Sequence, residues 1–369
     1  MESILFSPIK IKNLEIKNRF VRSATFEGLA SSEGLPSESL EKLYLKYAEG
    51  DIGLIIATSL IEHYKNFPVM GNFPYPLGFD EDKYIKAWQP VVSNVHKKGA
   101  KIAMQLMHPG RQELIQLRGS TPVAPSPVPK EQSAIIPVEL SQNEVRFYIE
   151  KFARAGRRVK EAGFDAVQLH GAHGYLISNF LSPHANRRKD SYGGSVEKRA
   201  KFVTDMVSRI KELNGDDFPV MIKMNFNDFL PGGIEPDEAL ELAVIFEKSG
   251  IDSIEVSGGT SAERWSHVVV KNIKNEDDES YFKTYSRLLK ERVKIPVILV
   301  GGHRTYSNMQ KLVAEGSCDL LSLSRPLIRD PYLINNFKDG TVEKSNCISC
   351  NLCFKNIFTH PVKCWVNKD

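Results

Sequence analysis

The sequence lacks the long apolar runs and the strong charge excess that would assign it to several other classes of protein. Its longest apolar runs, such as residues 53–57 and 296–300, are far too short to cross a membrane. Forty-nine Lys and Arg against 45 Asp and Glu leave a formal charge of +4, which provides no basic footprint for nucleic acid. The first eight residues lack a basic region followed by an apolar core, so we expect no secretory signal and a cytoplasmic location.

Two further absences concern cofactor binding and covalent cross-links. No G-x-G-x-x-G motif occurs in the 369 residues, which argues against a separate Rossmann-type dinucleotide-binding domain. Residues 1–317 contain no cysteine, whereas a secreted disulfide framework would spread its cysteines along the chain. The composition that is present, with 41% hydrophobic and 25% charged residues, is that of an ordinary globular protein.

Eight short, near-continuous hydrophobic runs alternate with longer amphipathic segments. The runs predict buried strands at residues 20–25, 53–58, 101–106, 164–170, 220–225, 252–257, 296–301 and 319–324. The segments between them predict helices at residues 38–49, 80–98, 141–162, 196–213, 236–248, 280–292 and 307–315. Eight strand–helix repeats favour a closed (β/α)8 TIM barrel of the α/β class over an open doubly wound sheet.

Segments outside these repeats predict additions to the barrel. Residues 6–18, with Lys12-Asn13 at the centre, predict an N-terminal hairpin that closes the barrel floor. The Pro-rich stretch 119–137 and the stretch 171–195 are expected to be inserted loops. We expect residues 1–343 to form the barrel, and residues 344–369 to form a short Cys-rich C-terminal extension.

Gly-rich turns and an arginine follow the last three predicted strands. They are Ser257-Gly258-Gly259, Gly301-Gly302 and Ser324-Arg325. Backbone N–H groups in such turns can approach an anion, and an arginine can bind it bidentately. Glycines also simply close tight turns between strands and helices. Because barrels commonly place a phosphate after strands seven and eight, the combination favours a phosphate site.

Strands three to five bring polar side chains to the same end of the barrel. Gln105 lies in the third predicted strand and Lys223 in the fifth. His170 ends the fourth strand and is followed by His173 and Tyr175. Imidazoles can hydrogen-bond a substrate oxygen, and tyrosine has a dissociable proton. A single histidine is more often structural, but two histidines and a tyrosine within six residues favour an active site.

A longer motif surrounds these histidines. Residues 168–176 are QLHGAHGYL, residues 180–183 are FLSP and residues 190–195 are DSYGGS. This motif resembles the Old Yellow Enzyme family of FMN-dependent oxidoreductases. Other segments that resemble the family are residues 8–11, 17–20, 104–111, 322–326 and 329–331. The resemblance therefore covers nearly the whole barrel.

The resemblance implies that residues 1–343 bind FMN non-covalently. The residues at positions matching those that line the flavin ring are Ser23, Ala24, Thr25, Ser59, Gln105 and His170. Lys223 stands where the family places a basic residue near flavin N1–C2=O. The phosphate would be held by Ser257, Gly301, Gly302, Ser324 and Arg325. The residue beside flavin C4a–N5 is either Thr25 or Phe26.

The resemblance also implies a two-step reaction. NADH or NADPH would dock transiently and reduce the flavin. Flavin N5 would then pass a hydride to the activated C=C bond of an α,β-unsaturated carbonyl compound. By matched position, His170 and His173 would hydrogen-bond the carbonyl oxygen and Tyr175 would donate the proton.

Four cysteines form a ligand-like pattern near the C-terminus. They are Cys347, Cys350, Cys353 and Cys364. Four thiolates suit a [4Fe–4S] cluster or a tetrahedral zinc ion. The segment resembles the iron–sulfur region of dienoyl-CoA reductases and trimethylamine dehydrogenases, although reduced thiols without a metal would also be consistent with it.

Other readings of the site stay open at this point. Lys223 inside a barrel strand would suit a Schiff-base lyase that binds a phosphorylated substrate. Tyr175, Phe26 and Trp265 could form an aromatic cage for the cation of an amine dehydrogenase of the trimethylamine dehydrogenase type. A flavin-binding scaffold without activity is a third alternative. As partners we expect a small-molecule substrate, no nucleic acid and no membrane, and a homo-oligomer is compatible with the sequence.

Overall fold

The structure is a computed structural model that describes residues 3–62, 75–112, 121–263, 265–357 and 359–366. Residues 119 and 120 of the predicted insertion lie outside this description. The same holds for residues 358 and 367–369 of the predicted C-terminal extension.

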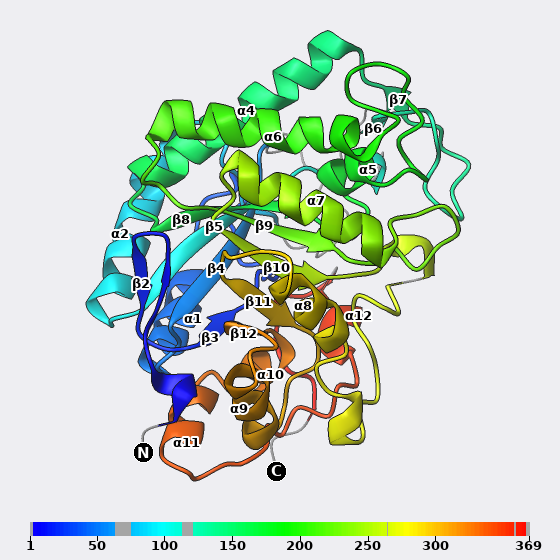
Figure 1. Cartoon of the computed structure of the whole chain (residues 1–369). Coiled ribbons are helices and arrows are strands. Elements are labelled where there is room, and N and C mark those ends of the chain that lie inside the picture. Colours follow the sequence, from blue (N-terminus) through cyan, green and yellow to red (C-terminus); the bar gives the residue numbers. More distant parts are fainter. Residues whose placement is uncertain (1–2, 63–74, 113–120, 264, 358, 367–369) are drawn as a thin grey trace.

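Eight parallel strands close into a barrel, which is seen from the side in Figure 1. They are β3 (Phe20–Arg22), β4 (Leu54–Leu60), β5 (Lys101–Met107), β8 (Ala166–Gly171), β9 (Val220–Asn225), β10 (Ser253–Ser257), β11 (Val297–Val300) and β12 (Leu320–Leu323). Each strand pairs with the next one in this order, and β12 pairs with β3 to close the ring. The eight predicted strands and the predicted (β/α)8 TIM barrel are thus confirmed.

Side chains of the strands alternate between two apolar cores. Ile55 and Ala57 of β4 belong to the larger core, which also contains the inner faces of the surrounding helices. Leu54 and Ile56 belong to a smaller core inside the barrel. The alternation follows from the two-residue period of a β-strand, and it explains why the strands are apolar on both faces.

A hairpin closes one end of the barrel, as predicted. β1 (Ile9–Ile11) pairs antiparallel with β2 (Leu14–Ile16), and Lys12 turns the chain with a φ of 56°. Ile11, Leu14 and Ile16 of the hairpin are buried in the inner core. In Figure 1 the hairpin lies at the left, whereas the helix α12 (Leu352–Lys355) lies at the opposite side. The other end of the barrel is therefore the one left for a site.

Seven long helices surround the barrel and confirm the seven predicted ones. They are α1 (Glu38–Glu49), α2 (Lys83–Lys97), α4 (Gln142–Glu161), α6 (Val196–Asn214), α7 (Pro236–Ser249), α8 (Lys283–Lys290) and α9 (Tyr306–Ala314). Local sequence sets several of their ends. Ser141 and Glu144 form the capping box at the start of α4, and Pro236 occupies the first turn of α7.

Shorter elements occur outside the predicted barrel strands and long helices. They are the helices α5 (Leu176–Leu181), α10 (Arg325–Arg329), α11 (Leu333–Lys338) and α12, the 3-10 turns η1 (Ile4–Phe6), η2 (Gly110–Gln112), η3 (Ser261–Glu263) and η4 (Glu276–Asp278), and the small sheet of β6 (Val123–Ala124) and β7 (Val138–Glu139). Elements of so few residues carry no measurable periodicity, so sequence patterns do not predict them.

The C-terminal extension packs against the barrel through its backbone. Lys344 forms an isolated bridge with Thr305, and the Ser345 N–H donates to the Arg304 carbonyl at 2.9 Å. Further along, the Val362 N–H donates to the carbonyl of Glu27 at 2.8 Å. The extension is thus anchored to both the seventh and the first βα units.

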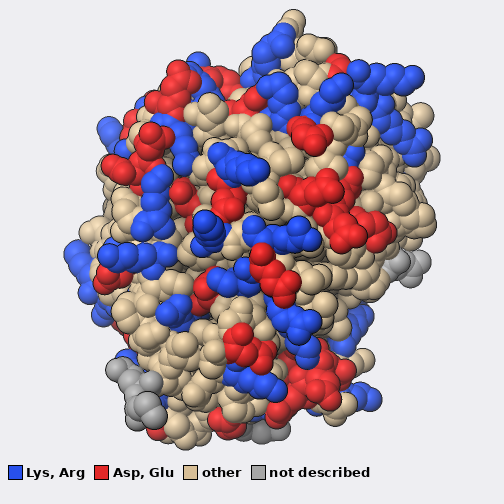
Figure 2. Space-filling model, in the orientation of Figure 1, with Lys and Arg blue, Asp and Glu red and all other residues tan. Residues whose placement is uncertain are grey.

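The distribution of charge on the surface agrees with the small net charge of the sequence. Figure 2 shows acidic and basic side chains interspersed over one face of the molecule, as expected from the small net charge. Across the part of the chain that the structure describes, no helix combines the length and apolar character needed to span a membrane.

Candidate functional site

A cavity of about 400 Å³ lies at the C-terminal end of the barrel strands. This volume is within the range of small-molecule sites. The predicted residues that line it are Ser23, Ala24, Thr25, Ser59, Gln105, His170, His173, Tyr175, Lys223, Ser257, Gly302, Ser324 and Arg325. Gly301, the other predicted ligand, is not part of the lining. The strand register therefore brings together side chains separated by as many as 302 positions.

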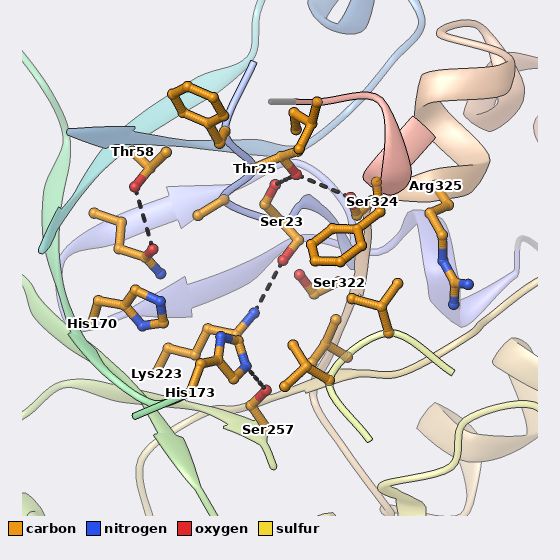
Figure 3. A pocket seen from close by; sticks show the side chains of 18 of the residues that line it. Ser23, Thr25, Thr58, His170, His173, Lys223, Ser257, Ser322, Ser324 and Arg325 are labelled. Atoms are coloured by element: carbon orange, nitrogen blue, oxygen red, sulfur yellow. Dashed lines mark hydrogen bonds between the residues drawn. The ribbon is translucent and has the colours of Figure 1, made fainter. Parts of the chain in front are cut away.

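The cavity has two chemically different ends. In Figure 3, His170 and His173 lie on one side and Arg325 on the opposite side, with Ser23, Thr25, Ser322 and Ser324 between them. An elongated ligand with a hydrogen-bonding head and an anionic tail would suit this arrangement.

The histidine end is built by the turn between β8 and α5. His173 and Gly174 both have positive φ values, 64° and 74°, and Tyr175 is the N-cap of α5. This tight turn packs the three rings together. The His170 ring centroid lies 5.1 Å from that of His173 and 4.9 Å from that of Tyr175. His173 Nε2 is 2.7 Å from Ser257 Oγ, and the His173 N–H donates to Asn225 Oδ1 at 3.1 Å.

The environment keeps these three side chains uncharged. Burial, together with the nearby Lys223 charge, lowers the pKa of His170 to about 3. Burial, His170 and Lys223 also hold the pKa of His173 well below its usual range. Burial raises the pKa of Tyr175 to about 12. At neutral pH the site therefore offers two neutral imidazoles and a protonated phenol, which can donate hydrogen bonds without carrying charge.

Two buried polar atoms of the cavity have no hydrogen-bond partner among the described residues. They are His170 Nδ1 and Ser59 Oγ, from side chains that line the cavity. Buried polar groups are normally paired, and an unpaired one in a binding site indicates a missing ligand. Both residues were predicted to contact FMN, so the lining fits a polar ring at this end.

Lys223 lies in a buried ion pair rather than as an isolated charge. Its Nζ is 2.9 Å from Glu255 Oε1 and 3.2 Å from Ser23 Oγ. Glu255 is fully buried and was not among the predicted site residues. Only the fold reveals it, because a single carboxylate within an apolar strand has no distinguishing pattern.

The turn after β3 is held from behind by Arg22. This fully buried guanidinium donates from Nη1 to the Ser23 carbonyl at 2.9 Å and to Thr25 Oγ1 at 2.6 Å. Its Nη2 donates to Glu27 Oε1 at 3.0 Å. Thr25 Oγ1 also lies 3.0 Å from Ser324 Oγ across the cavity. Arg22 therefore fixes the conformation of two predicted ring-binding residues.

At the other end, Gly301 and Gly302 form a turn that only glycine can make. Their φ values are 133° and 78°. A Cβ on Gly302 would lie 2.9 Å from Tyr281 Cε1 and overlap Ile273 as well. Arg325 Nη1 donates to the Val270 carbonyl at 2.6 Å and to Asn351 Oδ1 at 2.5 Å. The predicted phosphate end thus has a tight glycine turn beside an oriented guanidinium.

Apolar and aromatic residues cover much of the remaining lining. Phe26, Trp265 and Phe354 contribute rings, and the Trp265 centroid lies 6.1 Å from that of Tyr175. None of the described lining residues is Asp or Glu, whereas Lys223 and Arg325 are basic. The cavity thus suits a planar ligand that is neutral or negatively charged.

The C-terminal extension supplies part of this wall, which the sequence did not predict. Cys353, Phe354, Ile357 and Val362 line the cavity, and Phe354 lies 6.3 Å from Trp265. The four cysteines themselves line a second cavity of about 20 Å³ beside Arg325. The extension is therefore a structural part of the site.

The predicted metal site at these cysteines is not supported. Cys347, Cys350, Cys353 and Cys364 are free thiols around one cavity, but in the described segments they do not form a group that could hold a metal ion. Arg329 Nη1 lies 3.6 Å from Cys364 Sγ.

Comparison with known proteins shows extensive sequence similarity. Residues 4–344 match the model of the NADH:flavin oxidoreductase / NADH oxidase family. The chain is 38% identical over 355 residues to an NADH oxidase of Thermoanaerobacter brockii, covering 94% of this chain and 53% of that protein. It is 34% identical over 370 residues to a metal reductase of Desulforamulus reducens, covering 100% of this chain and 54% of that protein. The chain spans about half the length of these curated relatives.

Solved structures show the same barrel. The structure of 2-naphthoyl-CoA reductase with 2-naphthoyl-CoA matches with a TM-score of 0.88 and 25% identity, over 99% of this chain and 57% of that one. Histamine dehydrogenase from Rhizobium sp. 4-9 matches with a TM-score of 0.84 and 26% identity, over 98% and 51%. Morphinone reductase with tetrahydroNAD matches with a TM-score of 0.74 and 27% identity, over 92% and 91%.

The sequence and structure comparisons agree with the motif found at residues 168–195 and with the cavity around it. This chain belongs to the NADH:flavin oxidoreductase / NADH oxidase family, the Old Yellow Enzyme family that its sequence resembles.

Proposed function

We propose that this chain binds FMN in the cavity at the barrel rim and uses NADH or NADPH to reduce activated C=C bonds of α,β-unsaturated carbonyl compounds. The observation that carries the proposal is the cluster of His170, His173 and Tyr175 at one end of a cavity with Arg325 at the other. When bound, FMN would supply hydride transfer from the nicotinamide to the alkene. A cytoplasmic location is part of the same proposal.

The chain's own residues would hold the cofactor at both ends. Arg325 and the Gly302 turn would bind the phosphate, and Ser59, Gln105 and Lys223 would contact the ring. The unpaired Ser59 Oγ supports this assignment, because the ring would satisfy it.

The two imidazoles would bind the substrate's carbonyl oxygen. Since both are neutral, they donate hydrogen bonds that strengthen as negative charge develops on that oxygen. Tyr175 lies beside His170 and keeps its proton at neutral pH, so it can deliver this proton to the α-carbon. The rings of Trp265 and Phe354, which line the cavity, would exclude water from the reacting groups.

Two other readings of the site have weaker support. Lys223 Nζ is engaged with Glu255 Oε1 at 2.9 Å, whereas a Schiff-base lyase needs a lysine amine that is free to attack a carbonyl. Tyr175 and Trp265 lie close enough to contact a cationic amine, and a histamine dehydrogenase has the same barrel. The described lining, however, provides no carboxylate to balance such a cation.

Tyr175→Phe tests the proposal when the two half-reactions are measured separately by stopped flow. We expect reduction of the flavin by NAD(P)H to stay within about twofold of the parent. Reduction of a simple cyclic enone should slow by roughly 10²–10⁴-fold, the usual contribution of general acid catalysis. Tyr332→Phe, which removes an exposed phenol on α11, should change neither step. Equal losses in both steps would contradict the role of Tyr175, and a parent protein without flavin absorbance would contradict the proposal as a whole.

A further inference from the structure

Glu255 is a fully buried carboxylate inside the barrel, at the level of the predicted flavin ring. It lies in β10 between Ile254 and Val256. Both neighbours belong to the larger core, which packs against the surrounding helices. Because side chains alternate along a strand, Glu255 points the opposite way, into the barrel. A charged group at such a position needs a compensating partner.

Four side chains from four other strands or strand ends surround this carboxylate. Glu255 Oε1 accepts hydrogen bonds from Ser23 Oγ at 3.1 Å, Lys223 Nζ at 2.9 Å and Ser322 Oγ at 2.9 Å. Its Oε2 accepts from Gln168 Nε2 at 3.0 Å. Both carboxylate oxygens are therefore fully engaged, and the group has one defined orientation.

Three of these partners belong to the lining of the cavity. Ser23, Lys223 and Ser322 contact the cavity directly, whereas Glu255 lies behind them. Figure 3 shows Lys223 pointing toward Ser23, from the wall opposite Thr25. Gln168 extends the same network, because its Oε1 accepts from Gln105 Nε2 at 2.6 Å. The Glu255 carboxylate thus fixes side chains that come from several strands and form the floor of the cavity.

The carboxylate stays ionised in this environment. Burial alone would raise the pKa of Glu255, but the Lys223 ammonium and the hydrogen bonds lower it below its usual range. The cavity floor therefore contains a coupled positive and negative charge, formed by Lys223 and Glu255.

We infer that Glu255 is a positioning residue that holds Lys223 under the flavin ring and offsets part of its charge, and so sets the reduction potential of the bound flavin. The inference rests on the proposed FMN site. A lone ammonium would favour the more negatively charged, reduced form of the cofactor. The neighbouring carboxylate opposes that effect, so the pair gives a lower potential than Lys223 alone.

Glu255→Gln is the direct test, because it removes the charge and keeps the shape. We expect the variant to retain FMN, with a midpoint potential more positive than that of the parent. The ratio of reduced to oxidised flavin at a fixed potential should rise at least about tenfold, which is about 30 mV for a two-electron couple. Potentials would be measured anaerobically against a reference dye, and FMN content by absorbance.

Two further variants separate an electrostatic role from a merely structural one. Ser322→Ala removes one neutral hydrogen bond to the same oxygen and should change the potential much less than Glu255→Gln. In a Lys223→Met background, the buried carboxylate loses its counter-charge and takes up a proton. Adding Glu255→Gln to that background should therefore shift the potential by less than half of its effect in the parent. If Glu255→Gln does not fold, Glu255→Asp, which lengthens the ion pair, should raise the potential by a smaller amount.

The outcomes distinguish this inference from the proposed function. An unchanged or more negative potential in Glu255→Gln, in a parent that binds FMN, overturns the role of Glu255 alone. Equal shifts in the parent and Lys223→Met backgrounds also overturn it, because Glu255 would then not act through Lys223. A parent protein that binds no FMN overturns both the inference and the proposed function.

Discussion

His170 and His173, which are proposed to bind the substrate, show how burial selects one protonation state for a pair of imidazoles. Both side chains lie in the wall of the cavity near the Lys223 ammonium. Protonating either imidazole there costs more free energy than protonating it in water, so both pKa values are lowered. A charged imidazole would repel Lys223 and attract anions into the site. Neutral imidazoles instead recognise an uncharged carbonyl, which matches the substrate class proposed for this site.

The same effect predicts how stability depends on pH. The unfolded histidine binds a proton near pH 6.5, whereas folded His170 does so only near pH 3. Between these values the unfolded state binds more protons, so the free energy of unfolding falls as the pH falls. His170→Asn should reduce that dependence by up to about 1.4 kcal/mol per pH unit. Urea unfolding at several pH values from 7 to 4 would measure it.

A matched variant controls for the general acid sensitivity of the chain. His360→Asn removes an exposed imidazole from the C-terminal extension and is compared with the parent over the same pH range. A His170→Asn variant that unfolds with the same pH dependence as the parent would show that His170 is protonated in the folded protein.

At the scale of elements, the contact between α4 and α6 contains a glycine that the packing does not require. Gly156 of α4 is buried against Ile210 of α6, and a Cβ added there would lie 3.4 Å from Ile210 Cγ1, in ordinary contact. The glycine is not required by its backbone conformation, since it lies in the interior of a regular helix. It therefore costs conformational entropy without an evident steric need.

Gly156→Ala should consequently stabilise the protein by about 0.5–1 kcal/mol. Thermal or urea unfolding would measure the change. Gly163 provides the control from the end of the same helix, because its φ is 91° and only its backbone conformation demands glycine. Gly163→Ala should destabilise the protein by about 1 kcal/mol. A loss of stability in Gly156→Ala would mean that Ile210 cannot accommodate the methyl group.

The elements also show which parts of the fold are encoded locally. The eight strands and seven long helices were predictable because each has several apolar residues at a regular period. The predicted strand at residues 20–25 is shorter in the structure. β3 ends at Arg22, and the residues of the following turn line the cavity. The short helices α5 and α10 were not predicted, although both begin at site residues, Tyr175 and Ser324.

At the scale of the whole molecule, the C-terminal extension and the barrel form one site. Asn351 of the extension connects them, with its Oδ1 accepting from Arg325 Nη1 and its Nδ2 donating to the Val269 carbonyl at 2.6 Å. Asn351 has a left-handed backbone with a φ of 62°, and it is buried. The extension thus orients the arginine that is proposed to bind the FMN phosphate.

Asn351→Ala should therefore weaken FMN binding by about tenfold, since a hydrogen bond to a charged group contributes about 1.5–3 kcal/mol. Fluorescence titration of the flavin would measure the dissociation constant. Asn356→Ala alters a half-buried asparagine of the same extension, whose Nδ2 donates to the Leu352 carbonyl at 2.9 Å, and should leave the constant unchanged. Equal affinities of Asn351→Ala and the parent would show that the extension does not orient Arg325.

The sequence by itself determined the barrel, its floor hairpin and the histidine, tyrosine and arginine positions of the site. These features depend on the spacing of apolar residues and on motifs of a few residues. Both can be recognised in a local stretch of sequence. Only the tertiary structure decided that Glu255 pairs with Lys223 behind the cavity and that Phe354 and Asn351 complete it. It also placed the four cysteines around one small cavity beside Arg325, without a group among the described residues that could hold a metal ion. Such contacts arise because barrel closure joins residues more than 200 positions apart, as in the Ser23–Glu255 hydrogen bond, and no local pattern specifies them.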